Sequence, residues 1–355
     1  MRLYDGEEAA RIRERSAAME AAGEIDGALL DLAYEERLFK LFVPSELNGR
    51  MTPLPEAARL FERASWIDGA FGWLVTIGSG GGFFAGTLPE EEARRLFSGR
   101  EAVLAGSGMP TGRAVSVPGG YAVNGRWSFC SGSTFASFFT ANVMIEREGE
   151  AAEMRSFAFL PEQVEIVRDW NPLGLRATAS HTIEVKDAFV PAEMTFDIVS
   201  EPRLDDAIYR YPFLPFAQVS FAASSLGVYR HYLDECRLFA EQKSEAWREK
   251  SPQRLQALIG ELEEQEGRLA RASDDFYRTI DRTWQTFERE RTLPDEDWEA
   301  VSRASREAAS VARSGSEAIF PLLGMTALRY DHPLSRTWRD LHTVTQHSAL
   351  LPLAE

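Results

Sequence analysis

Two histidines near the C-terminus are the side chains of this sequence best suited to moving a proton. His342 and His347 lie in the segment RTWRDLHTVTQH, residues 336–347. Because imidazole titrates near neutral pH, either one could act as a general acid or base if it faces a cavity. We expect this segment to be helical, and a five-residue separation then places the two rings roughly 140° apart, so they do not share a metal ion. The alternative, histidines satisfied in the core or at an interface, stays open.

A second candidate site follows the motif GGYAVNGRWSFCSG, residues 119–132. Apolar and polar residues alternate on both sides of Asn124-Gly125, a dipeptide that favours a two-residue hairpin turn. We therefore predict a hairpin whose second strand passes through Phe129 to the small residues Cys130 and Ser131. Small side chains after an aromatic strand let a backbone and a hydroxyl approach a large flat molecule. The alternative is a surface hairpin that ends in a loop.

Two further segments carry side chains that suit a ligand. Trp170 opens the irregular stretch WNPLGLR, residues 170–176, where its indole would either stack on an aromatic cofactor or fill the core. Ser107 lies in another run of small residues, 104–108, which opens the region of predicted strands. The neighbouring His181, at the start of a later strand, is expected to be structural.

Three charged residues of the last segment, Arg336, Arg339 and Asp340, are expected to form ion pairs that fix this end of the chain. No CxxC or HExxH spacing is present, and this argues against a zinc site. No nucleophile elbow and no GxGxxG before a helix is visible either.

The elements that must position these residues begin with helices in residues 1–100. Apolar residues recur at helical spacing from 9 to 19, from 25 to 33 and over 54–67. Residues 70–86, AFGWLVTIGSGGGFFAG, are apolar on every side, which indicates a buried helix. The glycines within it either hold a cavity open or allow close helix packing.

From about residue 102 to 195 the apolar pattern changes to period two, with several short strands that suggest a compact barrel or sandwich. A proline-rich and aromatic linker follows at 202–216. Helical patterns at about 217–249, 253–291 and 295–323 then predict an antiparallel bundle. The predicted domains are residues 1–100, helical, residues 101–196, a β-barrel, and residues 197–355, a helical bundle.

The composition excludes several classes of partner. The chain has 355 residues and a net charge of −16, which argues against nucleic acid and against an anionic membrane surface. It contains no apolar run long enough to cross a bilayer. The two cysteines lie far apart in unlike contexts, which favours a reducing, cytoplasmic setting over a disulfide framework.

Three motifs resemble the acyl-CoA dehydrogenase superfamily, over essentially the whole chain. GGYAVNGRWSFCSG resembles the flavin-facing strand of that family, and NPLGLRATASHTIEVKDAFVP resembles its second barrel signature. The closing RTWRDLHTVTQH resembles a narrower branch, the reduced-flavin-dependent monooxygenases of the 4-hydroxyphenylacetate hydroxylase and dibenzothiophene monooxygenase type.

The resemblance implies a mainly α fold with a central β domain: an N-terminal helical domain, a small β-barrel and a C-terminal four-helix bundle. It implies FMN or FAD as cofactor, with the reduced form supplied by a separate flavin reductase, and a homotetramer built as a dimer of dimers. Carried over by position, His347, Ser131 and, after them, His342 are catalytic. The implied cofactor-binding residues are Ser107, Phe129, Cys130, Ser131 and Trp170.

The leading hypothesis is therefore a flavin-dependent oxidoreductase, the oxygenase component of a two-component monooxygenase that uses reduced flavin and O₂ on a small aromatic or heteroatom-containing substrate. The first alternative is an acyl-CoA dehydrogenase with bound FAD, although the EGT-like motif with its catalytic glutamate is missing here. The second is a non-catalytic protein of the same fold. The branch commonly carries a histidine in the buried N-terminal helix where this chain has residues 79–82, SGGG, and this departure puts aromatic hydroxylation in doubt.

Overall fold

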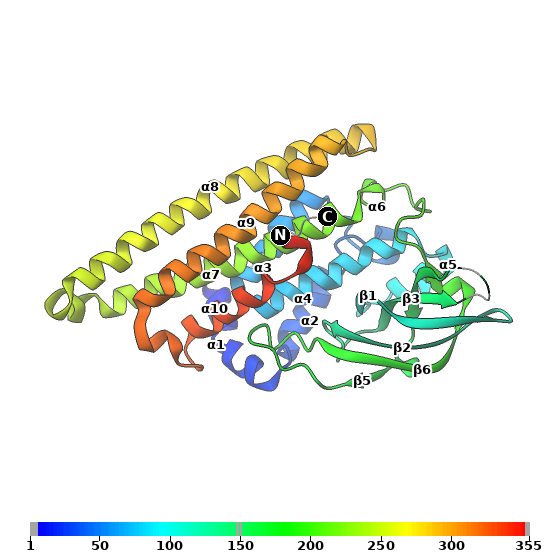
Figure 1. The fold of residues 1–355 in the computed structure, drawn as a ribbon, viewed down its shortest axis with the longest axis horizontal. Coiled ribbons are helices and arrows are strands. Elements are labelled where there is room, and N and C mark those ends of the chain that lie inside the picture. Colours follow the sequence, from blue (N-terminus) through cyan, green and yellow to red (C-terminus); the bar gives the residue numbers. More distant parts are fainter. Residues whose placement is uncertain (1–5, 147–148, 150, 352–355) are drawn as a thin grey trace.

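The fold consists of short N-terminal helices, a central sheet and long C-terminal helices. It is seen in a computed structural model that describes residues 6–146, 149 and 151–351. Figure 1 shows the long helices running side by side toward one end of the molecule, and the strands at the other end. One hydrophobic core continues through all three regions.

The N-terminal region is helical, as predicted. Its helices are α1 (Gly6–Ala22), α2 (Gly27–Glu35), α3 (Leu54–Ile67), α4 (Gly69–Gly80) and α5 (Glu90–Phe97), with short 3-10 turns at Leu38–Lys40, Ser45–Leu47 and Gly81–Gly86. Asp68 begins α4 as its N-cap, because its carboxylate accepts a hydrogen bond from the backbone N–H of Phe71 at 3.0 Å. α4 packs on α3 and on the first long C-terminal helix.

The glycines of α4 and the turn after it serve close packing at most positions. A Cβ at Gly81 would lie 2.1 Å from Leu104 Cδ2, and one at Gly72 would lie 2.1 Å from Ser65 Oγ. Gly80 differs, since the nearest atom to its Cβ position, in Phe216, is 4.0 Å away. Of these three positions, only Gly80 has free space around its Cβ position, so only there could a glycine hold a cavity open.

The strands form one mixed sheet rather than a barrel. Its order is β5-β6-β2-β1-β3-β4-β7, antiparallel except for the parallel pair β1/β3. Within the described residues the short end strands β5 and β7 each pair with one neighbour, so the sheet stays open and the predicted closed barrel is wrong. The strands are β1 (Leu104–Val117), β2 (Gly120–Cys130), β3 (Phe138–Glu146), β4 (Glu153–Phe159), β5 (Glu165–Val167), β6 (His181–Pro191) and β7 (Thr195–Phe196).

The hairpin predicted at Asn124-Gly125 is also wrong. Strand β2 runs straight through this dipeptide, and the turn lies earlier, at Pro118-Gly119, where Gly119 has φ +82°. The dipeptide instead marks a register shift against β6. Glycine is required there because a Cβ at Gly125 would lie 2.3 Å from Trp127 Cη2.

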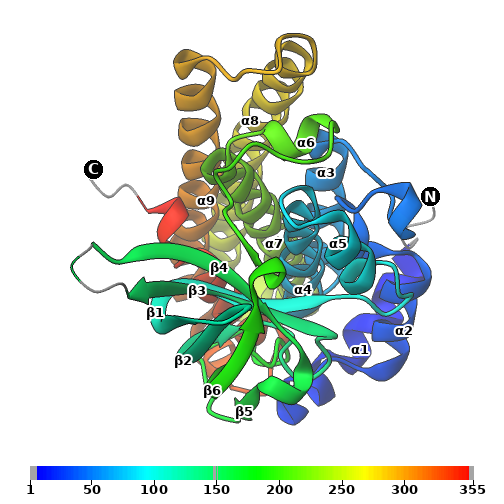
Figure 2. The ribbon, with the colours of Figure 1, turned by 90° about the vertical axis from the view of Figure 1, so that its right-hand side faces the viewer.

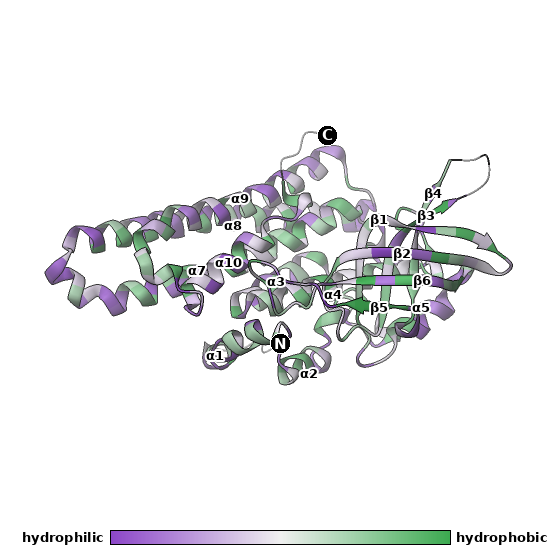
Figure 3. Ribbon diagram, turned by 60° about the horizontal axis from the view of Figure 1, so that its bottom comes forward, coloured by the Kyte–Doolittle hydropathy of each residue, from purple (hydrophilic) through white to green (hydrophobic). Residues whose placement is uncertain are grey.

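Three long helices make up most of the C-terminal region, as their apolar patterns predict. They are α7 (Phe213–Lys250), α8 (Pro252–Glu290) and α9 (Asp295–Leu323), preceded by α6 (Ala207–Arg210) and followed by α10 (Pro333–Val344). The apolar stripe of α8 is buried throughout, and Figure 3 shows hydrophilic bands recurring along the long helices beside it. α7 packs against α3, α8, α9 and α10, so its partners come from both ends of the chain and a separate four-helix bundle is not confirmed.

The final helix ends earlier than predicted. α10 stops at Val344, and His347 begins a 3-10 turn at Ser348–Leu350, so His342 and His347 do not share a helix.

Figure 2 shows the long helices rising behind the sheet. No helix among the described residues is long and apolar enough to span a membrane.

Candidate functional site

Hydroxyl groups from two segments meet where strand β2 ends. Ser131 follows β2, and Thr178 and Ser180 lie in the loop before β6. Ser131 Oγ lies 2.8 Å from Ser180 Oγ, which lies 2.7 Å from Thr178 Oγ1. The indole N–H of Trp73, from α4, donates to Ser131 Oγ at 3.0 Å. We refer to Ser131, Ser180 and Thr178 as the hydroxyl chain.

Strained backbone surrounds the hydroxyl chain. Phe129, Leu175 and Ala179 have φ of +67°, +53° and +44°, a left-handed conformation that costs a residue with a Cβ roughly 1–2 kcal/mol. Such strain clusters at functional sites in folded proteins. A register shift between Trp127 and Cys130 interrupts the pairing of β2 with β6 at the same place.

This conformation turns the ring of Phe129 outward. Phe129 is 69% exposed, and its ring meets Trp170 edge to face at 6.1 Å between centroids. Trp170 is held from two sides: its backbone N–H donates to His181 Nδ1 at 3.0 Å, and its indole N–H donates to the Leu175 carbonyl at 3.2 Å. The two aromatic residues form a fixed apolar surface beside Ser131.

The loop from Trp170 to Thr178 is fastened to the last helix. Arg339 donates to the Leu173 carbonyl at 3.1 Å, and the Asp340 carboxylate accepts from the Leu175 N–H at 2.6 Å. A Cβ at Gly174 would lie 2.2 Å from the Arg339 carbonyl oxygen, so only glycine allows this approach.

The charges behind this loop are buried. Arg339 forms an ion pair with Glu20 of α1, as expected of a structural arginine. Asp340 is different, because its described bond is to a backbone N–H and not to an arginine. Burial, with nearby Asp68 next in effect, raises the pKa of Asp340 to about 7.

His347 lies near the hydroxyl chain but does not touch it. Its ring contacts Phe221 at 4.1 Å and Trp73 at 6.2 Å between centroids. The indole of Trp73, which also contacts Ser131, therefore links the two predicted catalytic residues. Burial lowers the pKa of His347 to about 4, so the ring is neutral at pH 7. Since Nδ1 accepts the Ala349 N–H at 3.3 Å, the proton is assigned to Nε2.

His342, the other predicted catalytic residue, has different neighbours. It packs on Trp338 at 4.0 Å between centroids and lies 3.3 Å from Ser316 Oγ of α9. Burial lowers its pKa. None of these neighbours belongs to the hydroxyl chain, so its described contacts favour a structural role.

The remaining predicted cofactor contacts, Ser107 and Cys130, lie in unlike surroundings. Ser107 in β1 is half-buried, and its hydroxyl accepts from the Met109 N–H at 3.4 Å. Cys130 is fully buried; its thiol lies 3.5 Å from the Trp127 carbonyl, and burial raises its pKa to about 12. The Cys130 thiol has no exposed surface in this structure, and its predicted contact with a cofactor stays a prediction.

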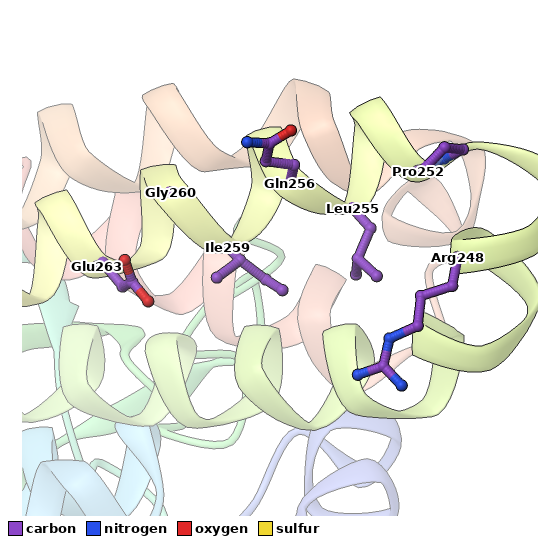
Figure 4. Close-up of a pocket in the computed structure, with 7 residues that line it drawn as sticks. All are labelled: Arg248, Pro252, Leu255, Gln256, Ile259, Gly260 and Glu263. Atoms are coloured by element: carbon purple, nitrogen blue, oxygen red, sulfur yellow. The ribbon is translucent and has the colours of Figure 1, made fainter.

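Two cavities of the described structure lie outside the hydroxyl chain. One of about 170 Å³ adjoins Trp170 and His181 and is lined in part by Arg168 and Arg176. This is below the roughly 300–1,000 Å³ typical of ligand pockets. The other, of about 410 Å³, lies between α7 and α8 near their junction, where Figure 4 shows Leu255 and Ile259 facing α7. Neither of these two cavities is lined by Ser131, beside which Phe129 offers an exposed aromatic ring.

Sequence reasoning missed Trp73, Thr178 and Ser180 as members of this site. Trp73 lies within the apolar segment 70–86, where nothing marks one residue as facing a ligand. The signal in the structure is partial exposure: Trp73, Ile77 and Gly80 are half-buried along one face of an otherwise buried α4. Thr178 and Ser180 are small polar residues in a loop, and only the fold brings them to Ser131.

Comparison with known proteins agrees with this architecture. Residues 219–352 match the family described as Acyl-CoA dehydrogenase, C-terminal domain. An indole-3-acetate monooxygenase from Pseudomonas putida is 28% identical over 348 residues, 98% of this chain and 88% of that protein. The oxygenase subunit HsaA of a flavin-dependent monooxygenase from Rhodococcus jostii is 26% identical over 365 residues, 95% of this chain and 91% of that protein.

A solved structure extends the likeness to the fold. The crystal structure of 3-HSA hydroxylase from Rhodococcus sp. RHA1 superimposes with a TM-score of 0.87 at 23% identity, covering 97% of this chain and 91% of that one. The chain is thus similar, over residues 219–352, to the acyl-CoA dehydrogenase C-terminal domain and, over nearly its whole length, to flavin-dependent monooxygenases such as the oxygenase subunit HsaA.

Proposed function

We propose that this protein is the oxygenase component of a two-component flavin monooxygenase, which takes reduced FMN or FAD from a separate reductase and oxygenates a small aromatic or heteroatom-containing substrate with O₂. The observation that carries the proposal is the strained, 69% exposed Phe129 beside Trp170 and the hydroxyl of Ser131. The similarity to proteins named as flavin-dependent monooxygenases supports it.

The residues present fit a flavin. Phe129 and Trp170 offer apolar surface to a flat ring system, and Ser131 offers a hydroxyl oxygen at its edge. Ser107 would add a polar contact. When bound, the reduced flavin supplies the electrons that activate O₂, and the protein supplies position and surroundings.

His347, Trp73 and Phe221 would form the substrate side of the site. His347 is neutral at pH 7 and presents an N–H donor from Nε2, while both of its aromatic neighbours exclude water. An imidazole with a pKa of about 4 positions an oxygen or a nitrogen atom by hydrogen bonding, and it is a weak base at neutral pH. The partly exposed face of Trp73 suits stacking with an aromatic substrate.

The described residues offer the dehydrogenase alternative no carboxylate base beside Ser131 or His347. Asp340 is buried and bound to the Leu175 N–H, and Glu235 pairs with His231 in α7. Glu317 is exposed on α9, and Glu355 lies outside the described residues. None of the three described carboxylates, Asp340, Glu235 and Glu317, contacts Ser131 or His347.

We further propose a homotetramer, a dimer of dimers, in a reducing cytoplasm. The resemblance implies the assembly, and the exposed groove between α7 and α8 gives it apolar surface to cover. The two buried free thiols, Cys130 and Cys236, suit a reducing compartment. The division into domains at residues 100 and 196 belongs to the same proposal, since helix gives way to strand after Phe97 and strand to helix after Phe196.

The test has two stages, on the intact protein. Anaerobic titration with reduced FMN and reduced FAD should show binding that Phe129→Ala weakens and Phe189→Ala does not; Phe189 is a control because it is a 51% exposed phenylalanine on β6. With reduced flavin and ¹⁸O₂, a panel of phenols, indoles and thiophenes should yield a product that carries one ¹⁸O atom. Absence of reduced-flavin binding would refute the proposal, and anaerobic oxidation of acyl-CoA thioesters by bound FAD would favour the dehydrogenase.

A further inference from the structure

We infer that the cavity lined by Trp170, Arg176 and His181 binds a small oxyanion, a carboxylate or an inorganic phosphate, which Arg176 and His181 hold by hydrogen bonds. The inference goes beyond the proposed function and does not depend on a flavin. The cavity measures about 170 Å³, which is far more than one water molecule needs and too little for a drug-sized ligand.

The walls of this cavity come from parts of the chain that are far apart in sequence. Ala22 ends α1 and Glu24 follows it, whereas Arg168, Trp170 and Arg176 lie between β5 and β6. A β-bridge from Glu24 to the loop before β6, at Thr178, joins the two parts. The walls are therefore held together by backbone contacts.

Arg176 supplies the first group of donors. Its guanidinium carries five N–H bonds, and those on Nη1 donate to Asn171 Oδ1 at 2.8 Å and to the Pro172 carbonyl at 3.3 Å. Among the described residues, no acceptor meets the N–H groups of Nε and Nη2, and no carboxylate pairs with this arginine. The guanidinium is thus fixed in place, and three of its N–H bonds remain for a ligand. Such a planar fork matches two oxygens of one oxyanion.

His181 supplies another donor. Its Nδ1 accepts the Trp170 N–H at 3.0 Å, which leaves the proton of a neutral ring on Nε2. Burial, with Arg168 next in effect, lowers the pKa of His181 below its ordinary 6.5, so the ring is mostly neutral at pH 7. The Nε2–H has no acceptor among the described residues. It calls for a ligand atom that accepts a hydrogen bond.

The charges around the cavity favour an anion. Arg168 pairs with Glu24 at 2.9 Å, and Arg176 has no such partner, so the cavity carries one net positive charge in a chain whose net charge is −16. Arginines near a helix C-terminus often serve to bind its last carbonyl groups. Here the bonds of both arginines go to Glu24, Asn171 and Pro172, and none goes to a carbonyl of α1.

Donors without acceptors, together with one uncompensated positive charge, determine the class of ligand. A cation is repelled, and a neutral acceptor leaves the charge of Arg176 unbalanced. A small oxyanion satisfies both groups. It also stabilises the fold, because its binding site exists only when the end of α1 and the loop before β6 are in place.

The experiment measures the binding of inorganic phosphate and of acetate to the intact protein by titration calorimetry at low ionic strength, with ³¹P line broadening for phosphate. The wild type should bind at least one of them with a Kd in the millimolar range, and added KCl should weaken this binding. Tighter binding of phosphate identifies a tetrahedral oxyanion as the ligand, and tighter binding of acetate identifies a carboxylate.

Three variants change the charge of the cavity in opposite directions. Arg176→Gln removes the unpaired positive charge and should weaken binding at least tenfold. Ala22→Glu adds a carboxylate at an exposed lining residue and should also weaken it at least tenfold. Glu24→Gln removes the one negative charge of the cavity and should tighten binding at least threefold.

The control is Arg113→Gln. Arg113 is an exposed arginine of β1 that pairs with Glu146 and does not line the cavity, so the variant makes the same change of charge elsewhere. It should leave the Kd unchanged.

Two results would overturn the inference. One is a wild type that binds neither anion, which means that the cavity holds only water. The other is binding that folded Arg176→Gln and Ala22→Glu leave unchanged. Both results leave the proposed function intact, since no flavin takes part in the experiment, and a protein that binds an oxyanion here but no flavin would refute the proposed function alone.

Discussion

Burial of the neutral His347 ring predicts that acid destabilises the protein through this one residue. Its pKa falls from an ordinary 6.5 to about 4 on folding, because the ring is removed from water and has no acidic partner. The unfolded chain then binds a proton between pH 6.5 and pH 4 that the folded chain refuses. Stability therefore falls as the pH falls through this window, and does not change on this account above pH 7.

The magnitude follows from the size of the shift. A difference of about 2.5 pKa units, 6.5 minus 4, corresponds to at most about 3.4 kcal/mol at 1.36 kcal/mol per unit, and to less where water still reaches part of the ring. His347→Gln keeps a polar side chain that does not titrate. As the pH falls from 7 to 4, the free energy of unfolding of the wild type should therefore fall relative to that of the variant, by up to this amount.

Urea unfolding of both proteins, followed by circular dichroism at several pH values from 8 to 4.5, measures the difference. All five histidines have lowered pKa values, so comparison with a single variant is needed to isolate one of them. Curves that stay parallel through the acid range would refute the reasoning. If the wild type instead became more stable relative to the variant as the pH fell, a carboxylate would have to face His347.

Three further predictions concern the backbone and the buried charge. Burial raises the pKa of Asp340 to about 7, so the stability that its protonated form contributes is complete below pH 4 and is lost as the pH rises through 7. In urea unfolding, the free energy of unfolding of Asp340→Asn should therefore rise relative to that of the wild type between pH 5 and 8. Gly81→Ala should cost roughly 1–3 kcal/mol of unfolding free energy through its clash with Leu104, whereas Gly80→Ala should be neutral or gain up to about 1 kcal/mol. Phe129→Gly relieves a positive φ worth about 1–2 kcal/mol and adds about 0.5–1 kcal/mol of chain entropy, so thermal unfolding should change little while the affinity for reduced flavin falls at least tenfold.

Sequence patterns predict the helices of this fold well because each buries a clear apolar stripe. The predicted segment 54–67 coincides with α3, and the long helices begin and end within a few residues of their predicted limits. The predicted turn at Asn124-Gly125 is wrong because two turn signals compete within eight residues, and pairing of β2 with β6 selects Pro118-Gly119. Closure of the sheet depends on its edge strands, which no local pattern encodes.

The candidate site, too, could be predicted only in part from the sequence. Phe129, Ser131 and Trp170 lie in motifs that sequence reasoning singles out, and the fold places them together. Asp340 was predicted as an ion-pair partner, since sequence alone cannot show that a backbone N–H of a distant loop would meet it.

The pairing of Glu20 with Arg339 joins positions 319 residues apart. During synthesis on a ribosome the N-terminal helix, the sheet and the loop after Trp170 all emerge before the helix that fastens them. The ligand-facing loop therefore acquires its final shape only after Arg339 and Asp340 have been synthesised, and a chain that stops before these residues lacks the contacts that orient the loop.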